Sequence, residues 1–395
     1  MNIGVVTHCE AINFGANLQA LSTAYYLLNN GHTPIFLNWN EYVNETINHY
    51  KILAEQYDMH INFLRDHGFK ITKPCSKNED FIREIENNDI HLILVGSDAV
   101  LTVASFLDKI LITKKGLKIK RVSINYKFPN PFWIPYYNKL KDVSVKFLSP
   151  SCQSTRWNLL KLSEKKEMKA CLNNFTCINA RDSYTARMMH NLLKQDVAIT
   201  PDPVFGFNQN VREILVEEKQ DFYSRMNIRR DYVCISFYGI PNENWLLTLK
   251  KEINDRNMDM LVIPMPQGSN IEVYDIKISL PLNSLDWYKL IKYSNGYIGH
   301  NMHPIIVSIH NSVPFFSIDQ HGKNLVGRFD KSSKVYDLLS RTGLLEYRVS
   351  VRDYKKLNPS IIMNRLENFD KRKCKEISDN LLEKYNNLMS SLIGE

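Results

Sequence analysis

The segment NIGVVTHCEAINFGANLQALSTAYYLLNNGHTPIFLNW, residues 2–39, decides the fold class of this chain. The apolar run at 2–7 predicts a strand, and an apolar helical pattern follows it as far as Gly31. TPIFLNW at 33–39 predicts the next strand. A strand, a helix and a second strand in that order predict a parallel sheet with a right-handed crossover.

The same alternation continues along the chain with one interruption. HLILVGSDAV at 91–100 predicts another buried strand, which ends in a polar loop. Residues 207–230 are polar and charged, and the alternation resumes at Asp231. The later predicted elements are the strands YVCISFYG (232–239), DMLVIPM (259–265), YDIKISLP (274–281), GYIGH (296–300) and PFFSID (314–319), with helices at 243–257 and 304–311.

These elements predict two Rossmann-like α/β domains that face each other across a cleft. At 395 residues the chain is too long for one ordinary core. Ligands bind beyond the carboxyl ends of parallel strands, so the loops at those ends are the first candidates for a site. The expected division is an N-terminal α/β domain at 1–209, a linker at 210–230, a C-terminal α/β domain at 231–345, and helices at 346–395 that pack back on the junction.

The composition is that of a globular protein, with 44% hydrophobic and 23% charged residues. The net charge of +8 suits an anionic ligand, and the basic cluster at 371–375 also suits peripheral contact with the inner membrane surface. Neither that cluster nor the one at 114–121 has the interleaved aromatics of a nucleic-acid platform. Seven cysteines without a CxxC motif, and a start without the basic region of a signal peptide, predict a cytoplasmic protein with reduced thiols.

The first predicted strand-to-helix turn holds Asn13, Gly15, Asn17 and Gln19. A glycine there lets the backbone approach a ligand, and a helix N-terminus favours an anion. Neither GxGxxG nor GxxxxGK[ST] occurs in this turn, so no nucleotide motif applies. A structural turn and a binding site both remain open.

Three further stretches place polar side chains in loops. Ser97 and Asp98 end a predicted strand, and Asp98 either caps a following helix or holds a sugar hydroxyl or another site side chain. Arg181 and Asp182 precede a helix, where a surface pair beside a helix cap is the simplest interpretation. Asp202 stands between two prolines, and this rigid turn fixes the direction of its carboxylate, either in a plain loop or in a site.

The stretch GHNMHPIIVSIHNSVPFF at 299–316 carries three histidines. Pro304 fits the first helical position, which places His303 at the helix N-cap. His310 lies about two turns further on, too far to share a metal with His303, and no HExxH motif is nearby, so no zinc site is predicted. The helix N-terminus lowers the pKa of His303, whereas a bound anion would favour the imidazolium. A polar cap and a catalytic histidine both remain open.

Five segments together resemble the polysaccharide pyruvyl transferase family. They are NFGANLQAL, LVGSDAV, NARDSYTARMM, TPDPVFG and YIGHNMHPIIVSIHNSVPFFSID, which span residues 13 to about 319 in the family's order. The resemblance implies a fold similar to that of the B-type glycosyltransferases. It also implies transfer of pyruvate from phosphoenolpyruvate, as a ketal across two hydroxyls of a sugar in a bacterial surface polysaccharide or its lipid-linked precursor. This chemistry requires no cofactor and no metal, and no nucleic-acid partner is expected.

The resemblance also implies roles for residues. His303 matches the family's histidine and is the expected general acid. The N-terminal domain is expected to hold the acceptor and the C-terminal domain the donor. The expected substrate-binding residues are Asn13, Gly15, Asn17, Gln19, Ser97, Asp98, Arg181, Asp202, His300, Asn301 and Lys323.

The chain departs from the family at two places. Many members have arginine two residues before the histidine, where this chain has Asn301, which offers no charge to a phosphate or a carboxylate. The tryptophan often seen after Gly-Ser-Asp is replaced by Ala99-Val100-Leu101. Asn301 keeps open a catalytically weakened carbohydrate-binding relative, and the shared architecture keeps open a nucleotide-sugar-dependent glycosyltransferase. The side chains that could supply the missing cation are Arg181, His300, Lys323 and Arg328.

Overall fold

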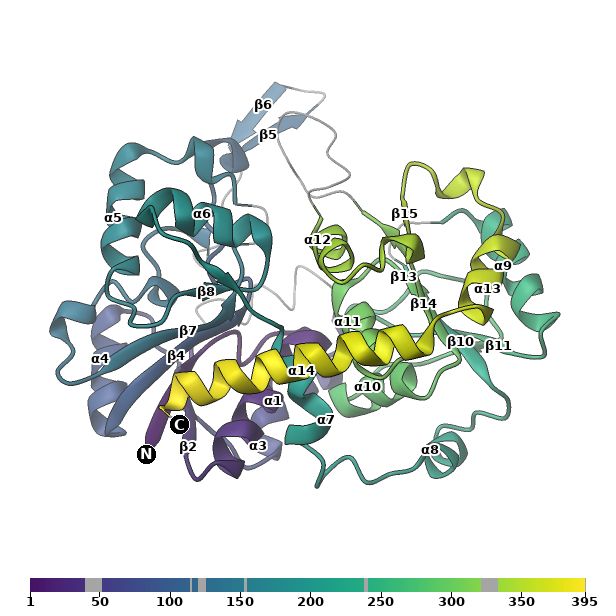
Figure 1. The fold of residues 1–395 in the computed structure, drawn as a ribbon, viewed down its shortest axis with the longest axis horizontal. Coiled ribbons are helices and arrows are strands. Elements are labelled where there is room, and N and C mark those ends of the chain that lie inside the picture. Colours follow the sequence, from purple (N-terminus) through teal and green to yellow (C-terminus); the bar gives the residue numbers. More distant parts are fainter. Residues whose placement is uncertain are drawn as a thin grey trace.

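The computed structural model describes residues 1–39, 52–113, 116–119, 126–152, 155–237, 241–320 and 333–394. Figure 1 shows two α/β halves side by side, with a long C-terminal helix lying along both of them. Each half is built on its own parallel sheet, which confirms the predicted fold class.

The sheet of the N-terminal half has five parallel strands in the order β3-β2-β1-β4-β7. The crossover from β1 through α1 to β2 is the unit predicted from residues 2–39. The strands are β1 (Asn2–Val6), β2 (Thr33–Phe36), β3 (Lys70–Ile71), β4 (Ile90–Asp98) and β7 (Ser144–Pro150), and the short pair β8 (Asn179–Ala180) and β9 (Ala198–Ile199) lies beside them. The helices are α1 (Phe14–Asn29), α3 (Ala54–Asp66), α4 (Asn78–Asn87), α5 (Leu162–Leu172) and α6 (Ser183–Leu193).

The sheet of the C-terminal half has six parallel strands in the order β12-β11-β10-β13-β14-β15. Its strands are β10 (Tyr232–Ser236), β11 (Asp259–Val262), β12 (Ile276–Lys277), β13 (Gly296–Gly299), β14 (Phe315–Asp319) and β15 (Arg348–Ser350). Its helices are α9 (Glu243–Asn254), α10 (Ser284–Lys292), α11 (Met302–His310), α12 (Lys334–Arg341) and α13 (Pro359–Glu367).

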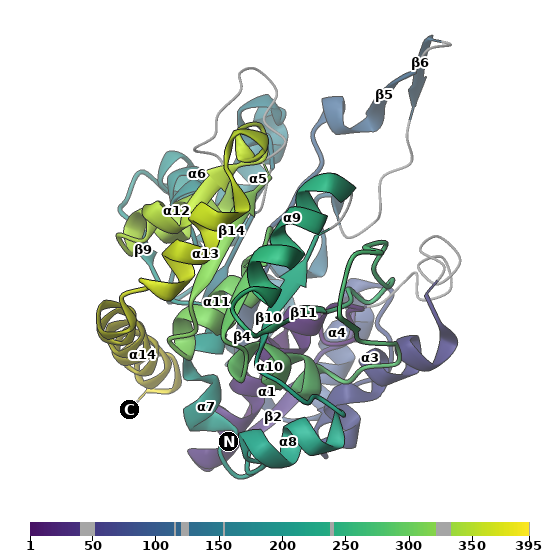
Figure 2. The same cartoon turned by 90° about the vertical axis from the view of Figure 1, so that its right-hand side faces the viewer.

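Some predicted elements differ from the observed ones. The strand expected at 274–281 is reduced to Ile276–Lys277, because this edge strand pairs only with β11 and only over two residues. The polar stretch at 207–230 contains the helices α7 (Phe207–Asn210) and α8 (Lys219–Arg225), because aromatic side chains such as Phe222 and Tyr223 are buried there. A hairpin of β5 (Ile110–Thr113) and β6 (Gly116–Ile119) projects from the N-terminal half, as Figure 2 shows.

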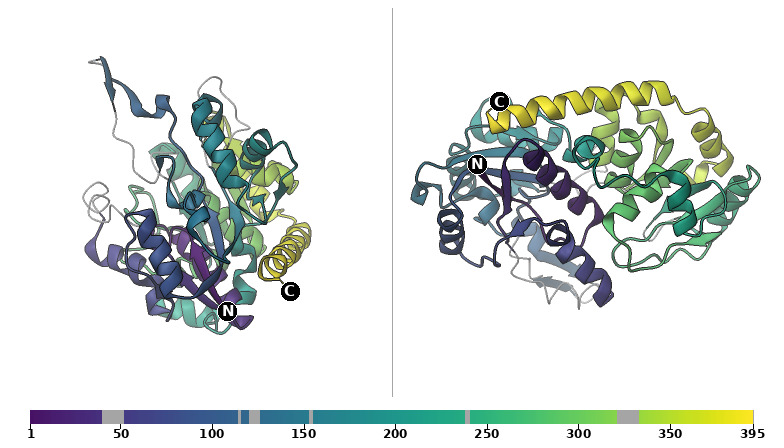
Figure 3. Two further views of the ribbon diagram at one scale, coloured as in Figure 1. Left: turned by 90° about the vertical axis from the view of Figure 1, so that its left-hand side faces the viewer. Right: turned by 90° about the horizontal axis from the view of Figure 1, so that it is seen from below.

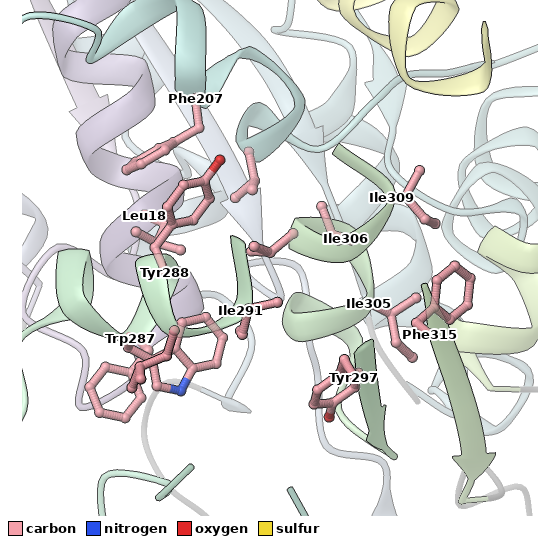
Figure 4. Close-up of a cluster of buried hydrophobic side chains, with 14 of the residues drawn as sticks. Leu18, Phe207, Trp287, Tyr288, Ile291, Tyr297, Ile305, Ile306, Ile309 and Phe315 are labelled. Atoms are coloured by element: carbon pink, nitrogen blue, oxygen red, sulfur yellow. The ribbon is translucent and has the colours of Figure 1, made fainter. Parts of the chain in front are cut away.

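The two halves share one hydrophobic core. Figure 4 shows Leu18 of α1 near Phe207 and Tyr288, and this group continues to Ile306 of α11. The ring of Phe14 stacks on that of Trp287 from the other half, with 5.3 Å between the ring centroids. Because this apolar contact crosses the junction, it fixes the position of one half relative to the other, and with it the positions of the carboxyl ends of the two sheets.

The long helix α14 (Lys371–Ile393) ties the halves together from outside, as Figures 1 and 3 show. It buries one side against α11 and against the turn at Pro203–Gly206, and its last turn reaches β7, where Lys146 Nζ donates to the carbonyl of Leu392 at 2.7 Å. Its buried residues lie on one helical face, mostly at spacings of three and four: Cys374, Ser378, Leu381, Tyr385, Leu388, Met389, Leu392 and Ile393. Within the described residues, no helix is both long enough and apolar enough to cross a membrane.

Candidate functional site

Gly15 and His303 bring the two halves into direct contact. Asn13 caps α1, because its side-chain oxygen accepts from the N–H groups of Gly15 and Ala16 at 2.9 and 3.2 Å. The imidazole of His303, from α11, packs against this first turn. A Cβ at position 15 would lie 2.1 Å from that ring, so only glycine leaves room for the histidine.

A buried hydrogen-bonded network lies beside this contact. Gln19, one turn after Gly15, donates through Nε2 to Asp202 Oδ2. Arg181 donates to Asp202 Oδ2 at 2.9 Å and to Asp98 Oδ1 at 3.3 Å, and its side chain is only 2% exposed. The Arg181–Asp182 pair is therefore not a surface pair. Asp182 caps α6 by accepting from Thr185 N–H at 2.8 Å.

Asp98 belongs to this network and caps no helix. It is the last residue of β4 and has a φ of 77°, and the loop after it contains no helix up to residue 105. Burial alone would raise the pKa of the Asp98 carboxyl, but Arg181 and Lys334 hold that pKa well below its ordinary value. Ser97 is also buried, but its hydroxyl donates to the carbonyl of Ser149 at 2.8 Å and so holds the loop.

His303 sits in the first turn of α11, whose N-cap is Asn301. The predicted helix start at Pro304 is wrong by two residues. Proline fits here because no N–H in the first turn of a helix has an intrahelical partner. Burial, assisted by Arg181 and Lys334, lowers the pKa of His303 against the opposing effect of Asp202 and Asp98. His303 is therefore neutral at pH 7, and its Nε2 is buried without a hydrogen bond to any described residue.

The residues around His303 do not replace the missing arginine. Asn301 Nδ2 donates to Ser236 Oγ at 3.3 Å, so this amide is turned toward β10. Burial lowers the pKa of His300 to about 4, which leaves it uncharged at pH 7. Lys323 and Arg328 lie outside the described residues.

Asn17 is the predicted site residue that the structure places elsewhere. Its Nδ2 donates to Ser284 Oγ on α10 at 3.0 Å and lies 3.0 Å from His60 Nδ1 on α3. These contacts join helices and do not reach the network around Arg181.

Two residues that the sequence patterns did not single out face the same network. His8 follows β1 and lies edge-on to Phe132 at 5.0 Å between ring centroids; burial and Lys334 lower the pKa of His8, and Asp98 opposes them. The position of His8 after a predicted strand was the available signal. Lys334 is the first residue of α12, and no local pattern marks it. We call His8, Asp98, Arg181, Asp202, His303 and Lys334 the junction cluster.

The junction cluster can exchange protons and balance charge. It combines two neutral imidazoles with two carboxylates and two cations, all at or near the carboxyl ends of strands. In the part of the chain that the structure describes, no three His, Cys, Asp or Glu side chains are grouped to hold a metal ion.

Comparison with known proteins gives a family and a fold. Residues 13–322 match the family model described as polysaccharide pyruvyl transferase. No curated protein matches the chain by sequence. Among solved structures, Glycyrrhiza uralensis UGT73P12 complexed with glycyrrhetinic acid 3-O-monoglucuronide has a TM-score of 0.54 at 8% identity, covering 100% of this chain and 96% of that one. The S. aureus MnaA-UDP structure has a TM-score of 0.50 at 9% identity, covering 95% and 90%. At such low identity these likenesses show the fold alone, which is that of the B-type glycosyltransferases.

Proposed function

This chain belongs to the polysaccharide pyruvyl transferase family, and from that premise we propose that it transfers pyruvate from phosphoenolpyruvate to a sugar. The product is a pyruvate ketal on two hydroxyls of a bacterial surface polysaccharide, such as a capsule or exopolysaccharide, or of its lipid-linked precursor. The protein works at the cytoplasmic side of the membrane, where the basic cluster at 371–375 suits peripheral contact with anionic lipid.

The observation that carries this proposal is the contact between Gly15 and His303 beside the Asp98–Arg181–Asp202 network. It gathers residues of all five family-like segments at one place, although those segments are far apart in the chain. The histidine has a buried, unpartnered Nε2 among the described residues, and such an atom is available to a ligand.

His303 supplies the proton that ketal formation needs. The imidazole is neutral in the free protein, and the negative charge of a bound phosphoenolpyruvate raises its pKa and draws a proton onto it. A sugar hydroxyl oxygen then bonds to the carbon that carries the phosphate. The π electrons of the enol bond take the proton from the His303 imidazolium, and the methylene becomes a methyl group.

The attacking hydroxyl must lose its own proton. His8 is neutral, makes no hydrogen bond with the described residues, and lies where Asp98 stabilises its protonated form. We assign it the role of base on the acceptor side. In the second stage the other sugar hydroxyl bonds to the same carbon, phosphate leaves with its bonding electrons, and the proton of that hydroxyl is released. Two C–O bonds form, one C–O bond breaks, and no electrons are gained or lost overall.

A ligand panel tests the donor. The melting temperature of the full chain is measured with phosphoenolpyruvate, with UDP and with UDP-sugars. A ligand at a hundred times its Kd stabilises the protein by about 2.7 kcal/mol, which is readily detected. We expect phosphoenolpyruvate to stabilise the chain and the uridine nucleotides to leave it unchanged. Stabilisation by a nucleotide sugar alone would identify a glycosyltransferase instead.

A further inference from the structure

A donor that carries both a phosphate and a carboxylate needs a cation, and the expected cations are already engaged. Arg181 is buried between Asp202 and Asp98 and is shared by the two carboxylates. His300 is uncharged at neutral pH, and Asn301 carries no charge. Apart from Arg181, the basic side chain of the junction cluster that can carry a positive charge outside the histidines is Lys334.

The N-terminus of α12 holds Lys334 at the carboxyl end of the second sheet. Ser333 caps this helix by accepting from Tyr336 N–H at 2.8 Å, and its hydroxyl donates to Asp319 at the end of β14. Arg348 on β15 donates to the same carboxylate at 2.7 Å. These hydrogen bonds therefore fix the start of α12 to the end of β14, the strand that follows α11 in the chain.

One side of α12 faces the N-terminal half. Asp337 accepts from the N–H of Ser183 at 3.4 Å, and Arg341 Nη2 donates to the carbonyl of Arg181 at 3.2 Å. Lys334 precedes these residues by three and by seven positions, so it lies on the same side of the helix. Lys334 therefore lies on the side of α12 that faces the loop carrying Arg181.

Lys334 acts electrostatically on the other members of the junction cluster without an ion pair to any of them. Its charge acts on Asp98, Arg181, Asp182, His8 and His303. Lys334 is half-buried, and no hydrogen bond or ion pair joins its ammonium to a described residue. Oδ2 of Asp182 is buried without a partner among the described residues. Burial and the nearby Arg181 lower the pKa of Lys334, while Asp98 and Asp182 oppose them. A cation held in this way has its charge available for a ligand.

We propose that Lys334 binds the phosphate group of the donor and supplies the charge that Asn301 does not. The inference rests on the proposed function. A lysine ammonium is a compact point charge with three donors, which suits the oxygens of a phosphate more than the planar fork of a carboxylate. The donor phosphate is thereby held between α12 and His303, with Asp98 beyond it on the acceptor side.

Isothermal titration of the full chain with phosphoenolpyruvate, inorganic phosphate and pyruvate tests this assignment. Lys334→Met keeps the apolar stem and removes the charge, and it should weaken phosphoenolpyruvate and phosphate binding by roughly 10- to 100-fold. Lys334→Arg keeps a cation and should retain most of the affinity. Lys251→Met removes an equivalent charge from the exposed side of α9 and should bind like the wild type. Lys334→Gln, which keeps a polar end, takes the place of Lys334→Met if the latter unfolds.

The remaining outcomes separate the two proposals. Wild-type affinity in Lys334→Met, with only a lower melting temperature, would mean that Lys334 merely balances the nearby carboxylates, and the donor assignment would survive. Loss of phosphoenolpyruvate binding with unchanged phosphate binding would move the contact to the donor carboxylate and overturn the inference. A wild-type protein that binds neither phosphoenolpyruvate nor phosphate would contradict the proposed function and this inference together.

Discussion

At the scale of single residues, Gly15 is the position where the smallest change should have the largest effect on the site. In Gly15→Ala the added Cβ would lie 2.1 Å from the His303 ring, so the imidazole must move. We expect a loss of about 1 to 3 kcal/mol in unfolding free energy, as for other overpacked sites, together with loss of transfer activity. Gly68→Ala is the control, because alanine would be strained at the φ of 81° found there but nothing lies within 4 Å of the added atom. It should lose comparable stability and keep its activity, and equal activity in both variants would remove the Gly15–His303 contact from the mechanism.

His303 should take up a proton when the donor binds. Its pKa is lowered in the free protein, so it is neutral at pH 7, and the anionic donor raises that pKa. The groups that act on it are Asp202, Asp98, Arg181 and Lys334. Phosphoenolpyruvate affinity should therefore increase as the pH falls from about 8 toward the pKa of free His303, with the sign expected for a group that is protonated only in the complex.

Calorimetry in buffers of different ionisation enthalpy measures this proton uptake directly. His303→Gln should bind without the uptake assigned to the histidine, because glutamine cannot titrate. An uptake in His303→Gln equal to that of the wild type would assign the proton to another group, such as His8 or the donor phosphate.

At the scale of elements, the start of α12 should govern donor affinity. Ser333→Ala removes the helix cap and the hydroxyl that binds Asp319, and should cost about 1 kcal/mol of stability. Because Lys334 follows directly, the Kd for phosphoenolpyruvate should rise as well. Asn358→Ala removes the comparable cap of α13, where the side chain accepts from Ser360 N–H at 3.0 Å, and should cost similar stability with no change in Kd. If both variants bind the donor equally, the position of α12 does not set its affinity.

The sequence predicted the positions of some site residues and helix starts but not of others. Asp98 ends one predicted strand and His303 lies three residues after another, so the sequence placed each at the carboxyl end of its own sheet. Their proximity followed only from the predicted cleft between the two domains. Lys334 follows no pattern, because its place depends on how α12 docks on residues 181–183. The first turn of α11 was misplaced because proline is compatible with several positions there. The direction of Asn17 depends on α3 and α10, which no local pattern specifies.

At the scale of the whole molecule, the shared core and α14 should make the two halves unfold together. Tyr385 is buried on α14, where its hydroxyl accepts from Asn210 Nδ2 at 3.0 Å and its ring lies edge-on to Tyr26. Tyr385→Ala should destabilise the chain by about 3 to 5 kcal/mol, as for other large buried aromatic residues. Scanning calorimetry should give one transition at a lower temperature. Two separate transitions would show that the halves are energetically independent.

The alternation of strands and helices predicted both sheets, but the core that joins them depends on contacts between distant segments and could not be predicted.

The most direct measurement is phosphate release from phosphoenolpyruvate in the presence of a panel of free and lipid-linked sugars, with mass spectrometry of the product. Phosphate should be released with at least one acceptor, and the product should carry a pyruvate ketal. His303→Asn should reduce this rate by about 100- to 10,000-fold, the usual contribution of a general acid. A product that carries a glycosyl group, or wild-type turnover in His303→Asn, would contradict the assignment of the junction cluster to pyruvyl transfer.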